Sequence, residues 1–257
     1  MNQKSTKATW LGTGVWSLVA LFIFIASLGC SWLTLKVVDF GFPLWYKMLN
    51  IETAIKTYAP RNQYRKRFEI TSPHEHKRLF HEIVIAIHSD TSRLHQIQYH
   101  DQTGKPIDTL LREPEIRHLE DVAMLLRSFF LLCGILTAGA ILLTLWLRQQ
   151  ALPFPGMKKI LIFQTLFLLF SAAAVLLIGP TAVFYQLHVW VFPPEHQWFF
   201  YYYESLMTTL MLAPDVFGPI AITLVTLAIP YTLLGFWLMK TYGTAPQHPQ
   251  YHSSPTH

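Results

Sequence analysis

Four stretches of this 257-residue sequence contain no charged residue. They lie between Lys7 and Lys36, between Arg127 and Arg148, between Lys159 and Glu195, and between Asp215 and Lys240. Each stretch holds at least the ~20 apolar residues that a helix needs to cross a bilayer. A chain with 52% hydrophobic residues could also be a soluble domain with a large core. The clustering of the charges between the stretches favours an integral membrane α-helical protein with four transmembrane helices.

The positive charges beside these stretches predict the orientation of the chain. Three short segments contain lysine or arginine and no acid: Lys4 and Lys7, then Arg148, Lys158 and Lys159, and finally Lys240. Lysine and arginine near span ends are retained in the cytoplasm. Both termini are therefore expected inside the cell, in a multi-pass protein of the cytoplasmic membrane. The net charge of +5 is mostly this topology signal, so we expect no nucleic-acid partner.

The chain divides into nine expected segments. They are a cytoplasmic N-terminus (1–9), a first span (10–35), an extracytoplasmic domain (36–114), a long helix that includes the second span (115–147), a cytoplasmic loop (148–159), a third span (160–183), an extracytoplasmic aromatic loop (184–217), a fourth span (218–239) and a disordered cytoplasmic tail (240–257).

The extracytoplasmic domain is expected to be small and of the α+β type. Ser72 and Glu75 form a capping box with Pro73 at the first helical position, which is typical of a helix start. The apolar residues that follow have helical spacing, although the β-branched run from Ile83 to Ile87 could also be a strand. Farther on, 94–99 and 107–111 could pair as a hairpin around a turn at 101–104.

Several kinds of chemistry receive no support from the sequence. His74, His81 and His88 are seven residues apart, so neighbours would be separated by about 10 Å along a helix and could not share a metal. Cys30 and Cys133 both fall inside predicted spans, so no disulfide framework is expected outside. Serine-hydrolase, P-loop and dinucleotide-binding motifs are absent from the sequence. We therefore expect neither a metal nor a cofactor.

The long helix carries the first candidate site residues. A helix over 115–147 would be about 50 Å long, whereas the hydrocarbon core is about 30 Å thick, so its first turns must protrude. His118 and Asp121 lie in those turns and, at a spacing of three, share one face of the helix. The carboxylate could fix the tautomer of an imidazole that titrates near neutral pH. Alternatively, the acid only offsets the helix dipole at a solvated end.

The aromatic segment before the fourth span is too apolar for a solvent loop and too interrupted for a span. We expect it to be re-entrant or interfacial and to line a pocket, because non-helical backbone at membrane depth needs polar partners. His188 is a candidate functional residue in this apolar context, although water or headgroups could also satisfy it. Glu204 is a weaker candidate. Arg127 lies on the opposite side of its helix from His118 and is expected to snorkel or to bind phosphate.

Two blocks of residues resemble the bacterial lipoprotein intramolecular transacylase (Lit) family. The first contains His118, Asp121 and Val122, and the second contains His188, Phe192, Trp198, Phe200, Pro214 and Phe217. The order of spans and outer segments is also similar over residues 10–240. The chain departs from the family pattern near Glu204 and Ser205, and its outer domain matches poorly, as in a distant member.

The resemblance implies an activity and a set of roles. The family transfers the sn-2 acyl chain of a diacylglyceryl-modified lipoprotein to the α-amine of its own N-terminal cysteine. We expect His118 and His188 to meet at the outer leaflet as general base and acid, with Asp121 orienting His118, and the sequence does not decide which histidine takes which proton. The expected substrate-binding residues are Phe192, Trp198, Phe200, Arg127 and Glu204. The alternatives are a non-enzymatic lipid or signal sensor, in which the two histidines would lie far apart, and a membrane deacylase that uses water.

Overall fold

The computed structural model describes residues 3–150, 154 and 156–243, and within them the chain is mainly helical. Four helices are long and apolar enough to cross a membrane: α1 (Gln3–Val37), α5 (Glu113–Gln149), α6 (Met157–Ile178) and α9 (Phe217–Gly243). The prediction of four spans is confirmed, and the protein is a multi-pass membrane protein. Residues 1–2, part of the expected inner loop (151–153 and 155) and most of the expected tail (244–257) lie outside the described residues.

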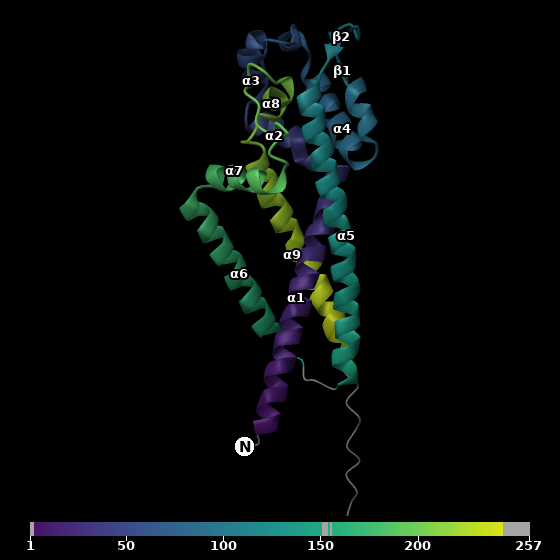
Figure 1. Ribbon diagram of the computed structural model, residues 1–257, viewed down its shortest axis with the longest axis vertical. Helices are drawn as coiled ribbons and strands as arrows, with labels where there is room; N and C mark the ends of the chain where they lie inside the picture. The colour runs from purple at the N-terminus through teal and green to yellow at the C-terminus, as the bar shows by residue number, and fades with distance from the viewer. Residues whose placement is uncertain (1–2, 151–153, 155, 244–257) are drawn as a thin grey trace, which may run out of the picture.

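Helix α1 packs along both α5 and α9, and these three helices form the central bundle (Figure 1). Small residues allow the close approach. A Cβ atom added to Gly235 of α9 would lie 2.5 Å from Cγ2 of Ile23 on α1. Because isoleucine is branched at Cβ and stiff at χ1, it cannot move aside cheaply. Glycine at this position therefore sets the distance between the two helices, as small residues do in membrane bundles.

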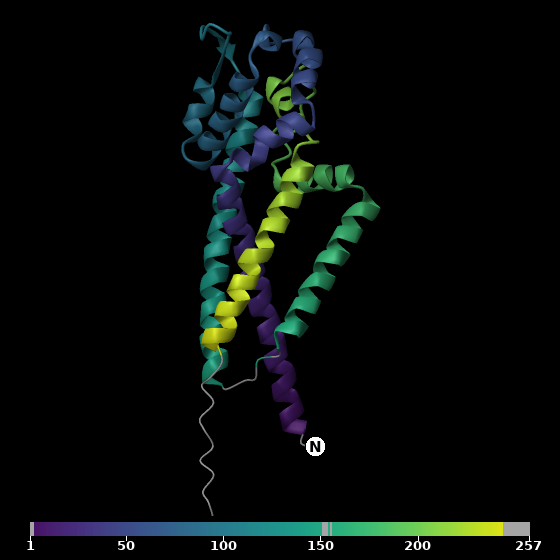
Figure 2. The ribbon, with the colours of Figure 1, turned by 180° about the vertical axis from the view of Figure 1, so that it is seen from behind.

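The third span is shorter than expected, and it diverges from the bundle toward α7 in both views (Figures 1 and 2). Its first turn packs with α1, because Ile160 and Trp16 belong to one buried cluster. Helix α6 ends at Ile178 rather than near residue 183, and α7 (Pro180–Val191) then turns across the direction of the spans. The turn lies at Gly179, whose φ of 97° suits glycine, and Pro180 occupies the first position of α7. The third span therefore ends at Gly179 and Pro180 rather than near residue 183.

Residues 39–112 form a compact region above the bundle, which we call the head (Figure 1). Its elements are η1 (Asp39–Gly41), α2 (Phe42–Met48), α3 (Ile51–Tyr58), η2 (Ala59–Arg61), η3 (Phe68–Ile70), α4 (Pro73–His88), η4 (Thr91–Gln96), β1 (Gln98–His100) and β2 (Pro106–Thr109). Its core includes Phe42 stacked on Phe80 of α4 at 3.9 Å. The first turns of α5 pack against α4 and η4. The 37-residue helix α5, about 55 Å long, therefore extends into the head as predicted.

The predicted start of α4 is confirmed, because the Ser72 hydroxyl accepts a hydrogen bond of 3.2 Å from the Glu75 backbone N–H. The helix continues to His88, so the β-branched run from Ile83 to Ile87 is helical. Its apolar residues are buried against the head core, and burial outweighs the weak strand propensity of this run. The expected hairpin is present as β1 paired antiparallel with β2, but it is shorter than expected, because residues 94–96 belong to η4 and the second strand ends at Thr109.

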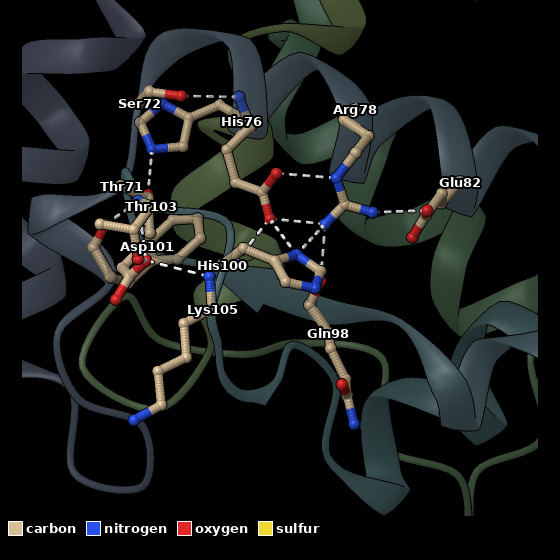
Figure 3. A network of polar contacts seen from close by, with 12 residues as sticks. Thr71, Ser72, His76, Arg78, Glu82, Gln98, His100, Asp101, Thr103 and Lys105 are labelled. Carbon is tan, nitrogen blue, oxygen red and sulfur yellow. Dashed lines mark hydrogen bonds and ion pairs between the residues drawn. The ribbon is translucent and has the colours of Figure 1, made fainter.

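A polar network joins α4 to this hairpin (Figure 3). One guanidinium nitrogen of Arg78 lies 2.5 Å from Glu75 Oε1 and also donates to the carbonyl oxygen of Gln98 at 2.6 Å. The same carboxylate accepts hydrogen bonds from the backbone N–H of His100 at 2.7 Å and from its ring at 2.9 Å. The nearly buried Glu75 is therefore fully paired, which fixes the position of the hairpin.

A second buried network in the head surrounds His76, which is 1% exposed. The Thr71 hydroxyl donates to the Phe68 carbonyl at 2.6 Å, so it must accept from His76 Nε2 at 2.7 Å. Nδ1 is then unprotonated and accepts the hydrogen bond of 2.7 Å from the Tyr46 hydroxyl. Burial lowers the pKa of His76 to about 4, so this histidine is neutral at physiological pH.

The segment between the third and fourth long helices, expected to be a re-entrant or interfacial loop, contains two helices. Residues 184–191 belong to α7, and the short helix α8 (Leu206–Met211) packs in the head core beside α3 and α4. All six residues of α8 are buried there. Part of the apolar composition of this segment is therefore explained by burial in the head core, because a buried helix in a small domain has the same composition.

Candidate functional site

The two histidines singled out in the sequence meet at the junction of the head and the long helices. The ring centroids of His118 and His188 are 6.1 Å apart, and the ring planes are inclined by 32°. His118 lies in the early part of α5, and His188 lies near the end of α7. The chain brings them together because α7 turns back toward α5 after Gly179. The expectation that the two imidazoles converge is confirmed.

His188 has a defined tautomer. Its Nδ1 lies 2.7 Å from the carbonyl oxygen of Phe184, one helical turn earlier, and an imidazole nitrogen can only donate to a carbonyl. In the neutral ring, Nε2 is therefore unprotonated and able to accept a proton. Burial lowers the pKa of His188 below its ordinary value, and the bond to the Phe184 carbonyl opposes this only in part. His188 lies outside the four candidate spans.

His118 is enclosed by aromatic rings. The centroids of the Phe192 and Phe200 rings lie 4.9 and 6.1 Å from its centroid. Its Nδ1 is buried and has no hydrogen-bond partner within the described part of the chain. An unpaired buried polar atom is costly in a folded protein, and it is often explained by a role in binding or catalysis.

An apolar cavity of about 400 Å³ opens beside both imidazoles, within the usual size range of small-molecule sites. Its walls come from α1, α4, α5, α7, α8, α9 and the connections between them, so the site exists only in the assembled fold. Most lining residues are aromatic or aliphatic. The lining side chains that carry N–H or O–H groups are Trp32, His118, Tyr185, His188, Trp198 and Thr208. The Trp32 indole already donates to His88 at 2.8 Å.

The predicted substrate-binding residues occupy different positions. Trp198 and Phe200 line the cavity, and the Trp198 ring packs on His188 at 5.0 Å. Phe192 is not part of the lining. It is buried and contacts both imidazoles, at 4.9 Å from His118 and 5.2 Å from His188, so it packs against the pair from outside the cavity.

Arg127 and Glu204 are not placed at the cavity. Arg127 is exposed on α5, where its charge contributes to a lowered pKa of Asp90 after the larger effects of hydrogen bonds from Ser92. Glu204 lies in a turn, in which its backbone N–H donates to the Tyr201 carbonyl at 2.9 Å. Neither residue lines the cavity. For Arg127 the reason is helical geometry, because nine residues correspond to half a turn away from His118.

Asp121 does not orient His118 as expected. Its Oδ2 accepts a hydrogen bond of 2.7 Å from Nδ1 of His196, which lies in the connection after α7. The spacing along α5 allowed a contact between Asp121 and His118, but the structure brings a better-placed imidazole from 75 residues away. His196 is a site residue that the sequence pattern does not single out. Its presence within the aromatic segment was the one available signal.

The described residues offer no obvious metal site. Within residues 3–150, 154 and 156–243, no group of three or more His, Cys, Asp or Glu side chains is placed to hold a metal ion. The chemistry that the geometry supports directly is proton transfer. Two imidazoles share an apolar cavity, and one of them has a free acceptor nitrogen.

Comparison with known proteins identifies the fold. No family model and no curated protein matches the sequence. Two solved structures are similar, both of the membrane-integral lipoprotein intramolecular transacylase Lit from Bacillus cereus. The first has a TM-score of 0.57 and 16% identity, covering 90% of this chain and 95% of the other. The second, a variant with a histidine-to-arginine substitution, has a TM-score of 0.58 and 15% identity over 93% of each chain. The protein therefore has the fold of Lit.

Proposed function

We propose that the protein is a membrane acyltransferase that acts on lipoproteins and moves the sn-2 acyl chain of a diacylglyceryl-cysteine to its own α-amine. One observation carries the proposal: the imidazoles of His118 and His188 lie 6.1 Å apart beside an apolar cavity. The fold shared with a lipoprotein intramolecular transacylase agrees with it. The substrate would be held with its acyl chains in the cavity and its polypeptide outside.

The reaction needs two proton transfers and no nucleophile from the enzyme. The substrate amine attacks the ester carbonyl carbon, the new C–N bond forms, and the bond from that carbon to the sn-2 glycerol oxygen breaks. The amine loses a proton, and the glycerol oxygen gains one. Because amine and ester belong to one molecule, holding them together supplies much of the rate.

We assign the base to His188 and the acid to His118. The Nδ1–H of His188 is committed to the Phe184 carbonyl, so Nε2 is the nitrogen that can take the proton of the amine. His118 then gives a proton to the departing glycerol oxygen. With ring centroids 6.1 Å apart, the two imidazoles can restore their starting states by proton transfer through one water molecule.

The cavity lining suits the uncharged parts of the substrate. Its apolar walls favour acyl chains by about 0.8 kcal/mol for each buried methylene. Hydroxyl groups of Tyr185 and Thr208 and the indole N–H of Trp198 are the donors available to the ester carbonyl as negative charge develops there.

Mass spectrometry of lipoprotein N-termini tests the proposal directly. Cells with the protein should contain N-acylated lyso-lipoproteins, and cells with His118→Ala or His188→Ala should lose them, with rates about 10² to 10⁴ times lower in purified assays. His95→Ala, which alters an exposed head histidine, is the matched control. Normal production by either site variant would refute the assignment.

The same experiment separates the alternatives. A deacylase would release free fatty acid and leave the amine unmodified. The sensor alternative expects widely separated histidines and no lipid-sized cavity, whereas the two ring centroids lie 6.1 Å apart beside a cavity of about 400 Å³, which favours the enzymatic proposals. A protein that changes neither the lipoprotein nor the fatty-acid pool would refute both enzymatic assignments.

A further inference from the structure

Residues 192–205, which connect α7 to α8, form a segment that we call the aromatic loop. It carries Trp198, Phe199 and Phe200 to the cavity wall. Trp198 packs on His188, with centroids 5.0 Å apart, and Phe200 lies 6.1 Å from His118. The loop therefore completes one side of the site, and its aromatic rings restrict the movement of both imidazoles.

The second half of the aromatic loop is anchored to the head. The carbonyl oxygen of Tyr203 accepts a hydrogen bond of 2.8 Å from the Gln63 backbone N–H. The Tyr202 ring stacks on Tyr58 at 4.5 Å, and its hydroxyl donates to the Ala213 carbonyl at 2.9 Å. These contacts hold residues 202 and 203, but they lie beyond the three aromatic residues that line the cavity.

The first half of the loop has mostly local hydrogen bonds. The backbone N–H of Phe192 donates to His188, that of His196 donates to Pro193, and the Gln197 amide donates to Phe199. Such bonds fix the local conformation without fixing the loop to the bundle. The hydrogen bond of 2.7 Å from His196 to Asp121 joins this half to α5.

The Asp121–His196 contact is partly sheltered from water. The side chain of Asp121 is 10% exposed, and that of His196 is 33% exposed. A carboxylate that is largely buried needs a hydrogen-bond partner, and a bond to a charged group is stronger than one between neutral groups. Neither residue is among those that line the cavity, so the contact lies outside the cavity wall. Asp121 is also one turn from His118 on the same helix.

We infer that His196 is a positioning residue, which holds the aromatic loop against α5 through Asp121 and so keeps Trp198 in place against His188. The inference rests on the proposed acyl transfer for its kinetic consequence, but its structural part does not. Loss of the contact frees residues 193–200, weakens the cavity wall and loosens binding of the acyl chain. The imidazoles themselves remain present and able to transfer protons.

The test combines amide hydrogen exchange with steady-state kinetics on the full-length protein, using a synthetic diacylglyceryl lipopeptide as substrate. In His196→Ala, exchange over 195–200 should accelerate about 10-fold, and KM should rise by a similar factor, with a smaller change in kcat. His196→Asn places an amide donor where Nδ1 lies and should restore both quantities. Glu113→Ala is the control, because it removes an exposed ion pair with Arg117 on the same helix.

Each outcome decides one part of the inference. Unchanged loop exchange in His196→Ala would overturn the positioning role. A fall in kcat as large as that of His188→Ala, with unchanged exchange, would also overturn it, because His196 would then act on the substrate. Asp121→Asn can still accept the bond and should keep most of the protection, whereas Asp121→Ala should not. If no variant transfers acyl chains, the proposed function fails, and the exchange data still decide the role of His196.

Discussion

The ring of His188 is tied to the backbone of its own helix, because its Nδ1–H donates to the carbonyl oxygen of Phe184 at 2.7 Å. This contact leaves Nε2 as the free nitrogen of the neutral imidazole. It also sets the ring beside Phe184, with centroids 4.1 Å apart. Fixing one nitrogen of a histidine in order to define the other is a common way to prepare a proton acceptor.

The substitution His188→Asn separates the position of this side chain from its basicity. The asparagine amide can still donate to the Phe184 carbonyl, but it cannot accept a proton at the position of Nε2. We expect kcat for acyl transfer to fall at least about 10²-fold while KM changes little. Steady-state kinetics on a lipopeptide measures both constants. A large rise in KM with a normal kcat would show that His188 binds substrate and does not transfer protons.

His76 makes the stability of the head depend on pH. Its pKa is lowered to about 4 by burial, compared with about 6.5 in the unfolded chain. Between these values the unfolded state binds the proton and the folded state does not, so the free energy of unfolding falls as the pH falls. The stability that the neutral His76 contributes is fully present above about pH 6.5 and is lost as the pH falls toward about 4. The total loss is at most about 3 kcal/mol. Thermal unfolding in detergent at pH 7 and pH 5 should show the loss.

A variant that lacks only the His76 imidazole gives the matching control for this prediction. His76→Gln should be less stable than the parent at pH 7, because it disturbs the bonds to Tyr46 and Thr71. However, its midpoint should change less between pH 7 and pH 5. His95→Gln alters an exposed histidine of the same region and should keep the parental dependence. Equal pH dependence in the parent and in His76→Gln would contradict the assignment.

The architecture was predictable where the bilayer restricts the sequence. Charges are excluded from the hydrocarbon core, so four charge-free stretches were enough to locate α1, α5, α6 and α9. The start of α4 was predictable for a local reason, since Ser72 caps the helix within four residues. His118 and His188 could also be identified from the sequence as candidate site residues, because polar groups at span ends in apolar surroundings are uncommon.

The remaining parts depended on contacts between distant segments. Hydrophobic composition cannot distinguish a loop entering the bilayer from α8 buried in the head, since both require apolar residues. The hydrogen-bond partner of Asp121 could not be predicted from the sequence either. Helical spacing indicates only neighbours on the same helix, whereas His196 reaches Asp121 through the turn at Gly179 and the course of α7. The sequence resemblance predicted that Phe192 binds the substrate. In the structure, Phe192 instead packs against the rings of both histidines from outside the cavity.

Gly235 should be necessary for close packing of α1 against α9. Any Cβ at this position would lie 2.5 Å from Ile23, so Gly235→Ala must separate the helices or displace a stiff side chain. We expect a loss of about 1 to 3 kcal/mol of stability, visible as a lower thermal midpoint in detergent. Gly134→Ala on α5 is the control, because a Cβ there meets nothing within 4 Å. Equal midpoints for both variants would show that the bundle adapts.

Filling the cavity from α9 should change which acyl chains are accepted. Ala221 lies in the second turn of α9 and lines the cavity, so Ala221→Trp places a large ring in the space that a long chain needs. We expect transfer of long chains to fall about 10-fold or more while short chains are still transferred, because each excluded methylene forfeits about 0.8 kcal/mol. Ile222→Trp, at a 70% exposed neighbouring position, is the control. Kinetics with lipopeptides of different chain length measures the effect, and an equal loss for all lengths would place the acyl chain elsewhere.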